Sequence, residues 1–208
     1  MKQIYLVRHA QSHYDPAIAE DQRPLTAKGQ EQAAALASVL LRLDIEEIHS
    51  SPYQRCLDTI RPFASTAALK LNQVASLRER SFTKSPIEDW AFVWEKVWAD
   101  FDFAFPDGES SREAQERMYE ATLLLAKTSL ARTLAISSHG NTIGLLLQCI
   151  DSRFTFAHAC AIRNPEVLRL MFDGTSLRWD PDFTIEELGS FATQVETRPV
   201  IRDGAESC

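Results

Sequence analysis

The sequence predicts an α/β layer fold with a mainly parallel central sheet. Short apolar runs rich in β-branched residues alternate along the chain with longer stretches whose apolar residues follow helical spacing. This alternation is typical of parallel strands joined by helices that cover the sheet. Of the 208 residues, 45% are apolar and 25% are charged, so the chain can build the core of one large domain, with or without a small cap.

The first predicted strand covers residues 4–7 and ends at Arg8 and His9. A permanent cation and a titratable ring at the end of a buried strand are costly unless other groups compensate them. In open α/β sheets this edge is where ligands bind. On these two residues alone, an anion site with a nucleophile and an Arg-His pair in a surface turn explain the pattern equally well.

A polar loop over residues 11–23 separates this strand from the first predicted helix. Thr26 is expected to be the N-cap of that helix. Gly29 falls in its first turn, where glycine lowers helix stability, so we expect another backbone to approach closely there. A second strand is expected at residues 45–49.

Ser51 and Pro52 predict the next helix start, with Ser51 as the N-cap and Arg55 at the end of the first turn. Pro62 is expected to end or kink this helix. Residues 71–77 predict a third strand that leads into Glu79.

Two capping boxes predict the helices that follow. Ser85-Pro86 with Glu88 opens the first, and Ser110 with Glu113 opens the second. The apolar stripe of the first helix follows tight helical spacing: Trp90, Val93, Trp94, Val97, Trp98 and Phe101. By burial statistics such a stripe is more often core than ligand site.

The last third of the chain predicts a strand, a helix and a hairpin. Residues 134–136 form the strand, which ends near His139, and an apolar helix follows at residues 143–150. Asp173-Gly174 predicts the turn of a hairpin. Residues 189–208 lack periodicity, and we expect this tail to be partly extended or disordered.

Charge and cysteine usage exclude several classes of protein. The formal net charge of -7 argues against binding to nucleic acid or to a charged membrane surface. No stretch is apolar for long enough to span a membrane, and the N-terminal run is too short for a signal peptide. The cysteines form no CxxC pair, so neither a zinc site nor a disulfide framework is expected, and reduced thiols in a cytoplasmic protein fit best. They are Cys56, Cys149, Cys160 and Cys208.

Charged and titratable side chains follow several of these predicted elements. If the strands are neighbours in one parallel sheet, their ends meet at one edge. Two guanidinium groups, two imidazoles and helix amides there would match a phosphoryl group. An imidazole can attack phosphorus, and a carboxyl group can protonate the leaving alkoxide and then activate water. No metal-ligand set is present in the sequence, so no cofactor and no metal are expected. The residues concerned are Arg8, His9, Arg55, Glu79 and His139.

Several short segments then resemble, in order, the motifs of the histidine phosphatase superfamily, which is also called phosphoglycerate mutase-like. The first resembles the RHG signature of that family, with Ala10 in place of the usual glycine. The matches run from Arg8 to Asn141. They are Arg8-His9-Ala10-Gln11-Ser12, Leu25-Thr26-x-x-Gly29, Ser50-Ser51-Pro52-x-x-Arg55, Leu77-x-Glu79, Pro106-x-Gly108 and Ser138-His139-Gly140.

The resemblance implies a three-layer fold with the central sheet flanked by helices and a small helical lid inserted at about residues 80–109. It implies one catalytic domain over residues 1–188, followed by the tail. It also implies that His9 is the phosphorylated residue and Glu79 the proton donor. The implied phosphate-binding residues are Arg8, Arg55, His139, Gly140 and Ser12.

The resemblance leaves the reaction open between a phosphatase and a mutase. Mutases of the family carry a Glu-Arg-His-Tyr-Gly segment and a long insertion, whereas Glu79-Arg80 is followed here by Ser81-Phe82-Thr83 and a short insertion. These differences favour a phosphatase acting on a small phosphorylated metabolite. A homodimer is compatible with the sequence. A phosphoprotein phosphatase would need a more open site than the tryptophan-rich stretch suggests.

Asp15 departs from the family pattern, which has an asparagine that donates to the phosphate at this position. An ionised aspartate cannot donate a hydrogen bond. Asp15 could therefore point away, pair with Lys28 or select a substrate that carries a cation. It is also the one residue that favours a degenerate site, in which the chain would be a phospho-ligand binding or regulatory module.

Overall fold

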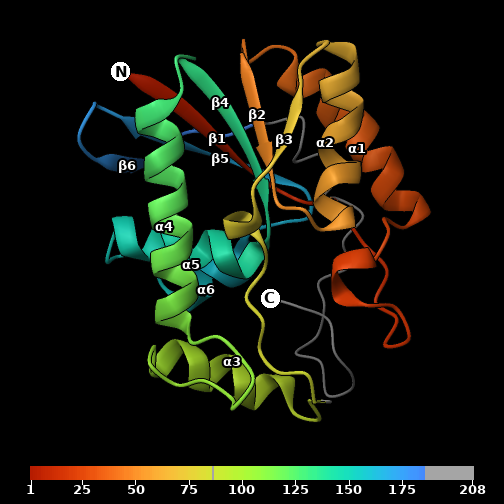
Figure 1. Ribbon diagram of the computed structural model, residues 1–208, viewed down its shortest axis with the longest axis vertical. Helices are drawn as coiled ribbons and strands as arrows, with labels where there is room; N and C mark the ends of the chain where they lie inside the picture. The colour runs from red at the N-terminus through yellow and green to blue at the C-terminus, as the bar shows by residue number, and fades with distance from the viewer. Residues whose placement is uncertain (86, 186–208) are drawn as a thin grey trace.

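The computed structural model, which describes residues 1–85 and 87–185, has a six-stranded central sheet (Figure 1). The strand order is β3-β2-β4-β1-β5-β6. The first four of these strands are parallel, whereas β5 and β6 continue the sheet in antiparallel pairs. The predicted mainly parallel sheet is therefore confirmed. The strands are β1 (Lys2–Arg8), β2 (Glu47–Ser50), β3 (Leu71–Gln73), β4 (Thr133–Ser138), β5 (Glu166–Phe172) and β6 (Leu177–Asp180).

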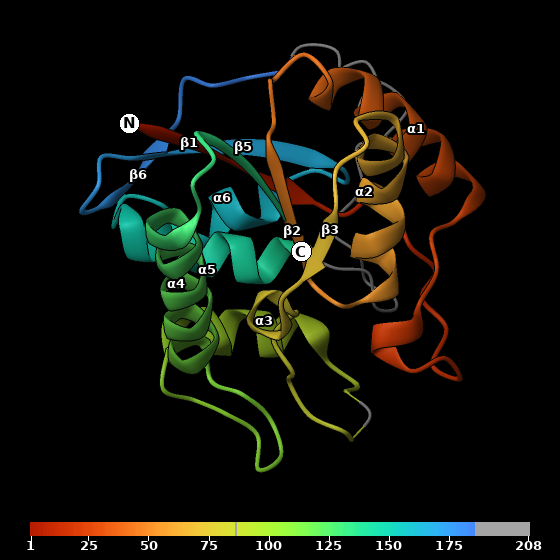
Figure 2. The same cartoon turned by 45° about the horizontal axis from the view of Figure 1, so that its top comes forward.

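Helices cover both faces of the sheet, as Figure 2 shows. They are α1 (Ala27–Leu40), α2 (Gln54–Thr66), α3 (Trp90–Ala99), α4 (Ser111–Thr128), α5 (Gly140–Ile150) and α6 (Phe156–Ala161), with short 3-10 turns η1 (Glu20–Gln22) and η2 (Ala75–Leu77). Ile4 and Leu6 of β1 belong to the core with α4, α5 and α6, whereas Tyr5 and Val7 belong to the core with α1 and α2. Because side chains alternate along a strand, one apolar run fills both cores.

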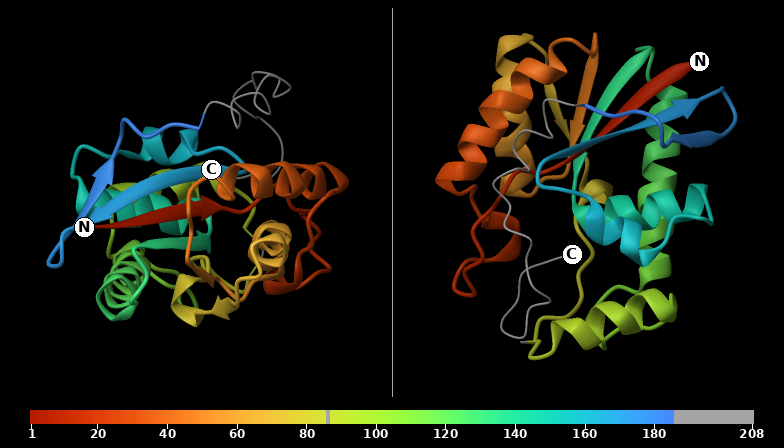
Figure 3. Two further views of the ribbon diagram at one scale, coloured as in Figure 1. Left: turned by 90° about the horizontal axis from the view of Figure 1, so that it is seen from above. Right: turned by 180° about the vertical axis from the view of Figure 1, so that it is seen from behind.

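The register of the parallel strands brings their carboxyl ends level. Arg8 of β1 lies opposite Ser138 of β4, and Ser50 of β2 lies opposite Ser137. The residues that follow β1, β2 and β4 therefore leave the sheet together. The helix α3, the one helix described between residues 80 and 109, lies beyond this end of the sheet (Figures 1 and 3).

Two of the predicted helix starts are confirmed. The Thr26 hydroxyl accepts a hydrogen bond from the Gly29 amide at 2.9 Å and caps α1. Ser110 and Glu113 form the capping box of α4, with each side chain bonded to the other residue's backbone amide. Such a box satisfies two amides that the first turn of a helix leaves unpaired.

The predicted start of α2 is wrong by two residues. The helix begins at Gln54 with Tyr53 at the N-cap, and the Ser51 hydroxyl lies 2.8 Å from Nε2 of His139 instead. Pro62 does not end the helix, which continues to Thr66. Proline removes only one backbone donor, and the buried Phe63 and the apolar face around it keep the last turn packed against the core.

The third strand and the lid helix also differ from the prediction. β3 ends at Gln73, after which the chain forms η2 instead of continuing as a strand to Leu77. The helix α3 begins at Trp90, and the Asp89 carboxylate accepts a hydrogen bond from the Phe92 amide at 2.9 Å. The predicted box at Ser85 therefore does not open α3, and its Pro86 lies outside the described residues.

Towards the chain's end, the predicted hairpin is confirmed as β5 and β6, and Gly174 in its turn has a φ of +105°. The short helix α6 was not expected, because six residues are too few to show a helical pattern. The predicted tail at residues 189–208 lies outside the described residues.

Cys160 corrects the expectation of reduced thiols. Cys56 and Cys149 are free, but Cys160, at an exposed position in α6, is disulfide-bonded. The spacing of cysteines in a sequence does not reveal which distant thiols the fold brings into reach. Within the described ranges, no helix combines the length and the apolar character that a membrane crossing requires.

Gly29 lies against the loop that follows His9. A Cβ atom added to Gly29 would be 2.0 Å from the Gln11 carbonyl oxygen, so the expected close backbone approach is confirmed. We expect Gly29→Ala to lower the free energy of unfolding by about 2 kcal/mol, because the clash outweighs the gain in helix propensity. Urea denaturation measures this, and a stabilised variant would contradict the packing described here.

Candidate active site

His9 follows β1 and has a ring whose proton position its neighbours define. Arg55 donates through Nε to Nε2 of His9 at 3.2 Å. Nδ1 lies 2.7 Å from the Ala10 carbonyl oxygen and must be the protonated nitrogen, because a carbonyl can only accept. Burial, followed by the charges of Arg55 and Arg8, lowers the pKa of His9 well below its usual value. The ring is therefore neutral, and its lone pair at Nε2 accepts the hydrogen bond from Arg55.

Arg55 extends from the first turn of α2 and uses every guanidinium nitrogen. Besides its bond to His9, Nη1 donates to the Glu20 carbonyl oxygen at 2.7 Å and Nη2 to the Glu20 carboxylate at 3.0 Å. The guanidinium also lies 4.9 Å from the ring centroid of Tyr53. Burial raises the pKa of Glu20, while Arg55 favours its ionised form.

Arg8 is the second buried cation of the site. Nη1 donates to the Ile162 carbonyl, while Nε is buried without a hydrogen-bond partner among the described residues. The guanidinium packs directly on Gly140, where an added Cβ would lie 2.8 Å from Cζ. Burial lowers the pKa of Arg8 to about 10, and Glu79 and Glu166 oppose that shift. Arg8 therefore keeps its charge at neutral pH and has a free donor.

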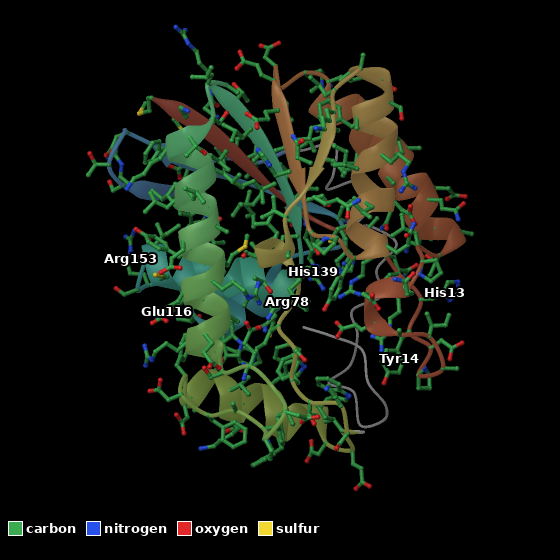
Figure 4. All side chains as sticks on the ribbon, viewed as in Figure 1. His13, Tyr14, Arg78, Glu116, His139 and Arg153 are labelled. Atoms are coloured by element: carbon green, nitrogen blue, oxygen red, sulfur yellow. The ribbon has the colours of Figure 1, made fainter. Side chains whose placement is uncertain are left out.

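His139 follows β4 and occupies the N-cap position of α5. Its ring centroid lies 5.3 Å from that of His9, with the planes at 66°. Burial, followed by the charge of Arg55, lowers the pKa of His139 well below its usual value. Nε2 meets the Ser51 hydroxyl, and Sγ of the buried Cys56 lies 3.4 Å from the same nitrogen. Figure 4 shows His139 at the lower end of the sheet, near the centre of the molecule.

Glu79 joins the site through the N-terminus of α5. Its Oε1 accepts hydrogen bonds from the Thr142 amide at 3.1 Å, from the Arg80 amide at 2.9 Å and from the Thr142 hydroxyl. The N-cap residue His139 makes no side-chain cap, so Glu79 supplies the acceptor that the first turn of α5 needs. This contact places the carboxyl group near enough to Arg8 for its charge to act on that guanidinium.

Comparison with known families shows which superfamily the chain matches. The family model described as the histidine phosphatase superfamily (branch 1) matches residues 4–180.

The chain belongs to the histidine phosphatase superfamily.

Relatives within the superfamily carry different names. A probable phosphoglycerate mutase GpmB of Citrobacter koseri is 27% identical over 201 residues, which cover 91% of this chain and 93% of that protein. Its counterpart in Salmonella arizonae is 28% identical over 161 residues, covering 72% and 75%. Among solved structures, a mycobacterial glucosyl-3-phosphoglycerate phosphatase superposes with a TM-score of 0.72 at 20% identity, covering 86% of this chain and 98% of that one. A phosphoserine phosphatase of Entamoeba histolytica gives 0.70 at 17% identity, covering 86% and 95%. These likenesses confirm the superfamily fold.

Gly140 and Ser12 are the two remaining predicted phosphate-binding residues. Gly140 opens α5 against Arg8, as described above. Ser12 is half-buried and pairs with Leu25 in an isolated β-bridge. No hydrogen bond among the described residues joins the Ser12 hydroxyl to His9 or to either arginine.

Asp15 is held by its own loop. Its Oδ1 accepts a hydrogen bond from the Ala17 amide at 2.8 Å, and its carbonyl accepts from the Ile18 amide. No hydrogen bond or ion pair to Lys28 is among the interactions of the described residues. Figure 4 shows the neighbouring His13 and Tyr14 well to one side of His139. The Asp15 carboxylate therefore stabilises a turn in this structure.

Sequence reasoning missed the residues that fix the backbone around His9. The Ala10 amide donates to the Thr59 hydroxyl at 2.9 Å, and Nδ2 of Asn164 donates to the His9 carbonyl at 2.9 Å. Thr59 follows Arg55 by four residues, so it shares a helix face with a predicted site residue and could have been found from that spacing. Asn164 and Glu20 lie in segments without periodicity and gave no such signal.

The lowered pKa values of His9 and His139 predict how stability depends on pH. Below pH 6.5 an unfolded chain binds protons that the buried neutral rings do not, so stability is lost as the pH falls. From pH 6.5 to 5.5 we expect the two histidines to lower the free energy of unfolding by about 2 kcal/mol. Glu20 has a raised pKa, so it takes up a proton more readily in the folded chain and offsets part of this loss. Urea denaturation at both pH values measures this. His139→Asn should remove about half of the histidine contribution, and an unchanged pH dependence in that variant would contradict the assignment.

Proposed function

We propose that this member of the superfamily is a metal-independent phosphatase that hydrolyses small phosphomonoesters through a phosphohistidine on His9. The observation that carries the proposal is the state of the His9 ring. It is neutral, its proton is held on Nδ1 by Ala10, and its Nε2 lone pair lies within hydrogen-bond distance of a buried guanidinium. A nucleophile toward phosphorus needs that lone pair, and the departing charge needs that cation.

The proposed reaction has two steps. Nε2 of His9 gives up its hydrogen bond from Arg55 and attacks phosphorus, the phosphorus–oxygen ester bond breaks, and the leaving alkoxide takes a proton from the carboxyl group of Glu79. The resulting carboxylate then removes a proton from water, which attacks the phosphohistidine and releases phosphate and free His9. Arg8, Arg55 and His139 would stabilise the charge on the transferring group. The unpaired Nε of Arg8 supports that role.

The predicted lid supports a small substrate. Phe82 makes edge-to-face contacts with Trp90 and Trp94, with ring centroids 5.5 Å and 5.0 Å apart. These half-buried rings belong to the segment that lies beyond the carboxyl ends of the strands (Figure 1). An apolar cover of this kind favours a small phosphorylated metabolite over an exposed phosphoprotein segment.

A phosphoglycerate mutase-type phosphotransferase is the second candidate. It is favoured by the names of the relatives at 27% and 28% identity. In that reaction the phosphohistidine would return its phosphoryl group to the substrate instead of passing it to water.

One experiment separates the candidates. We expect hydrolysis of an aryl phosphate to continue in EDTA, and we expect no interconversion of phosphoglycerates with a bisphosphoglycerate primer. Isomerisation that is faster than phosphate release would overturn the phosphatase in favour of the mutase. Phosphate binding without either activity would identify a phospho-ligand binding module.

A further inference from the structure

Glu20 is hydrogen-bonded to Arg55, one of the arginines that would bind the phosphoryl group in the proposed mechanism. Both outer nitrogens of Arg55 are bonded to it, Nη1 to its carbonyl and Nη2 to its carboxylate. The third nitrogen donates to His9. The side chain of Arg55 is 6% exposed and that of Glu20 39%, so the cation is fixed while the carboxylate lies at the edge of the site. Each outer nitrogen keeps one further N–H, but the Glu20 carboxylate holds the Nη2 donor that faces it, so a phosphoryl group can bind that donor only if the carboxylate withdraws.

Withdrawal would also remove an unfavourable charge. A phosphomonoester carries a dianionic phosphoryl group, and like charges within a few ångströms repel in a poorly solvated site. Arginine binds phosphate best through two nitrogens at once. Glu20 and phosphate therefore compete for the charge of Arg55 and for this Nη2 donor.

Arg23 offers Glu20 a second position. It follows Glu20 by three residues, at the C-cap of η1, and its Nε is buried without a hydrogen-bond partner among the described residues. Its charge acts on the Glu20 carboxylate. The guanidinium is held 4.7 Å from the ring centroid of Tyr14, so it is already ordered. A carboxylate that leaves Arg55 would find a cation with an available donor on the same turn.

We propose that Glu20 is a specificity-determining residue that competes with the substrate's phosphoryl group for Arg55 and moves to Arg23 when displaced. This rests on the proposed function to the extent that the site takes a phosphoryl group. The competition lowers the affinity of the site for every phosphate dianion, including the product. It therefore favours release of inorganic phosphate after each turnover and selects esters whose other groups contribute to binding.

The test is calorimetric binding of inorganic phosphate to the full chain. Glu20→Gln keeps the shape of the side chain and removes its charge, and we expect phosphate to bind about five- to tenfold more tightly. Asp21→Asn is the matched control, because this neighbouring carboxylate is exposed and bonds only to the Gln22 side chain among the described residues. It should change the affinity by less than about twofold. Unchanged or weaker binding to Glu20→Gln would overturn the proposal. Glu20→Ala should change the affinity in the same direction as Glu20→Gln.

A second variant tests the receiving position. Arg23→Gln should weaken phosphate binding about threefold when Glu20 is present, because the displaced carboxylate then has no second cation to bind. In the Glu20→Gln background the same change should leave phosphate binding unchanged, because residue 20 then has no carboxylate that Arg23 could bind. Equal weakening in both backgrounds would show that Arg23 binds phosphate itself, and would overturn this part of the proposal.

Binding of phosphate is measured without turnover, so the two proposals can fail separately. Tighter binding to Glu20→Gln in a chain that hydrolyses nothing would refute the phosphatase and support the competition. If the wild-type chain hydrolyses phosphate esters but Glu20→Gln binds phosphate with unchanged affinity, the competition is refuted and the phosphatase is supported.

Discussion

Replacing His9 by alanine should abolish turnover. We expect kcat for an aryl phosphate to fall by a factor of about 10⁴ or more, because His9 is the one imidazole among the described residues that accepts a hydrogen bond from Arg55. Water would then have to attack the substrate directly, with only the cations of the site to assist. Steady-state kinetics with purified variant protein measures the loss.

His13→Ala is the matched control for this loss. His13 also lies in the segment that follows β1, but it is exposed and its amide pairs with the Pro24 carbonyl. We expect this variant to keep wild-type kcat within about threefold, the size of effect that surface changes produce. His9→Ala should also still bind inorganic phosphate, because Arg8 and Arg55 remain. Retained turnover in His9→Ala, or a comparable loss in His13→Ala, would contradict the assignment of the nucleophile.

Replacing Glu79 by glutamine should have the second largest effect, and the effect should depend on the leaving group. Glutamine can still accept the hydrogen bonds from Thr142 and Arg80 through its amide oxygen, so the start of α5 should be preserved. It cannot donate the proton that an alkoxide needs. We expect kcat to fall by about 10²- to 10⁴-fold for an alkyl phosphate and far less for an activated aryl phosphate.

Glu116→Gln controls for the loss of one negative charge. Glu116 is exposed on α4, away from His139 in Figure 4, and its replacement should not alter the rate for either substrate. Glu20 has a carboxylate that is bonded to Arg55, so it is the alternative proton donor that this comparison tests. If Glu20→Gln lost activity toward alkyl phosphates while Glu79→Gln retained it, Glu20 would be the proton donor.

The sequence contained enough information to predict the sheet and the histidines at its edge. Apolar runs that end in Arg8-His9 and near His139 combine a strong local pattern with a general rule about parallel strands. The register, with Arg8 opposite Ser138, is the physical reason that these distant residues meet. The capping boxes were predictable only where local hydrogen bonds decide the helix start, as at Ser110.

Other features depend on tertiary contacts that no local pattern records. Ser51 has the sequence of an N-cap, but its hydroxyl meets His139, so the helix starts later. Glu20 lies in a loop without periodicity, and its pairing with Arg55 across 35 positions of sequence appears only in the folded chain. Asp15 was the conspicuous departure in the sequence, yet in the structure it stabilises a local turn, and it is the carboxylate of Glu20 that accepts a hydrogen bond from Arg55.

The covalent intermediate tests the central claim most directly. The protein is mixed with an aryl phosphate, quenched within milliseconds in alkali, and digested for mass spectrometry under conditions that preserve phosphohistidine. We predict acid-labile phosphate on the peptide that contains His9 and none in His9→Ala. Phosphate trapped on any other residue, or turnover by the wild-type protein with no trapped phosphate and with inversion of configuration at phosphorus, would contradict the phosphohistidine mechanism.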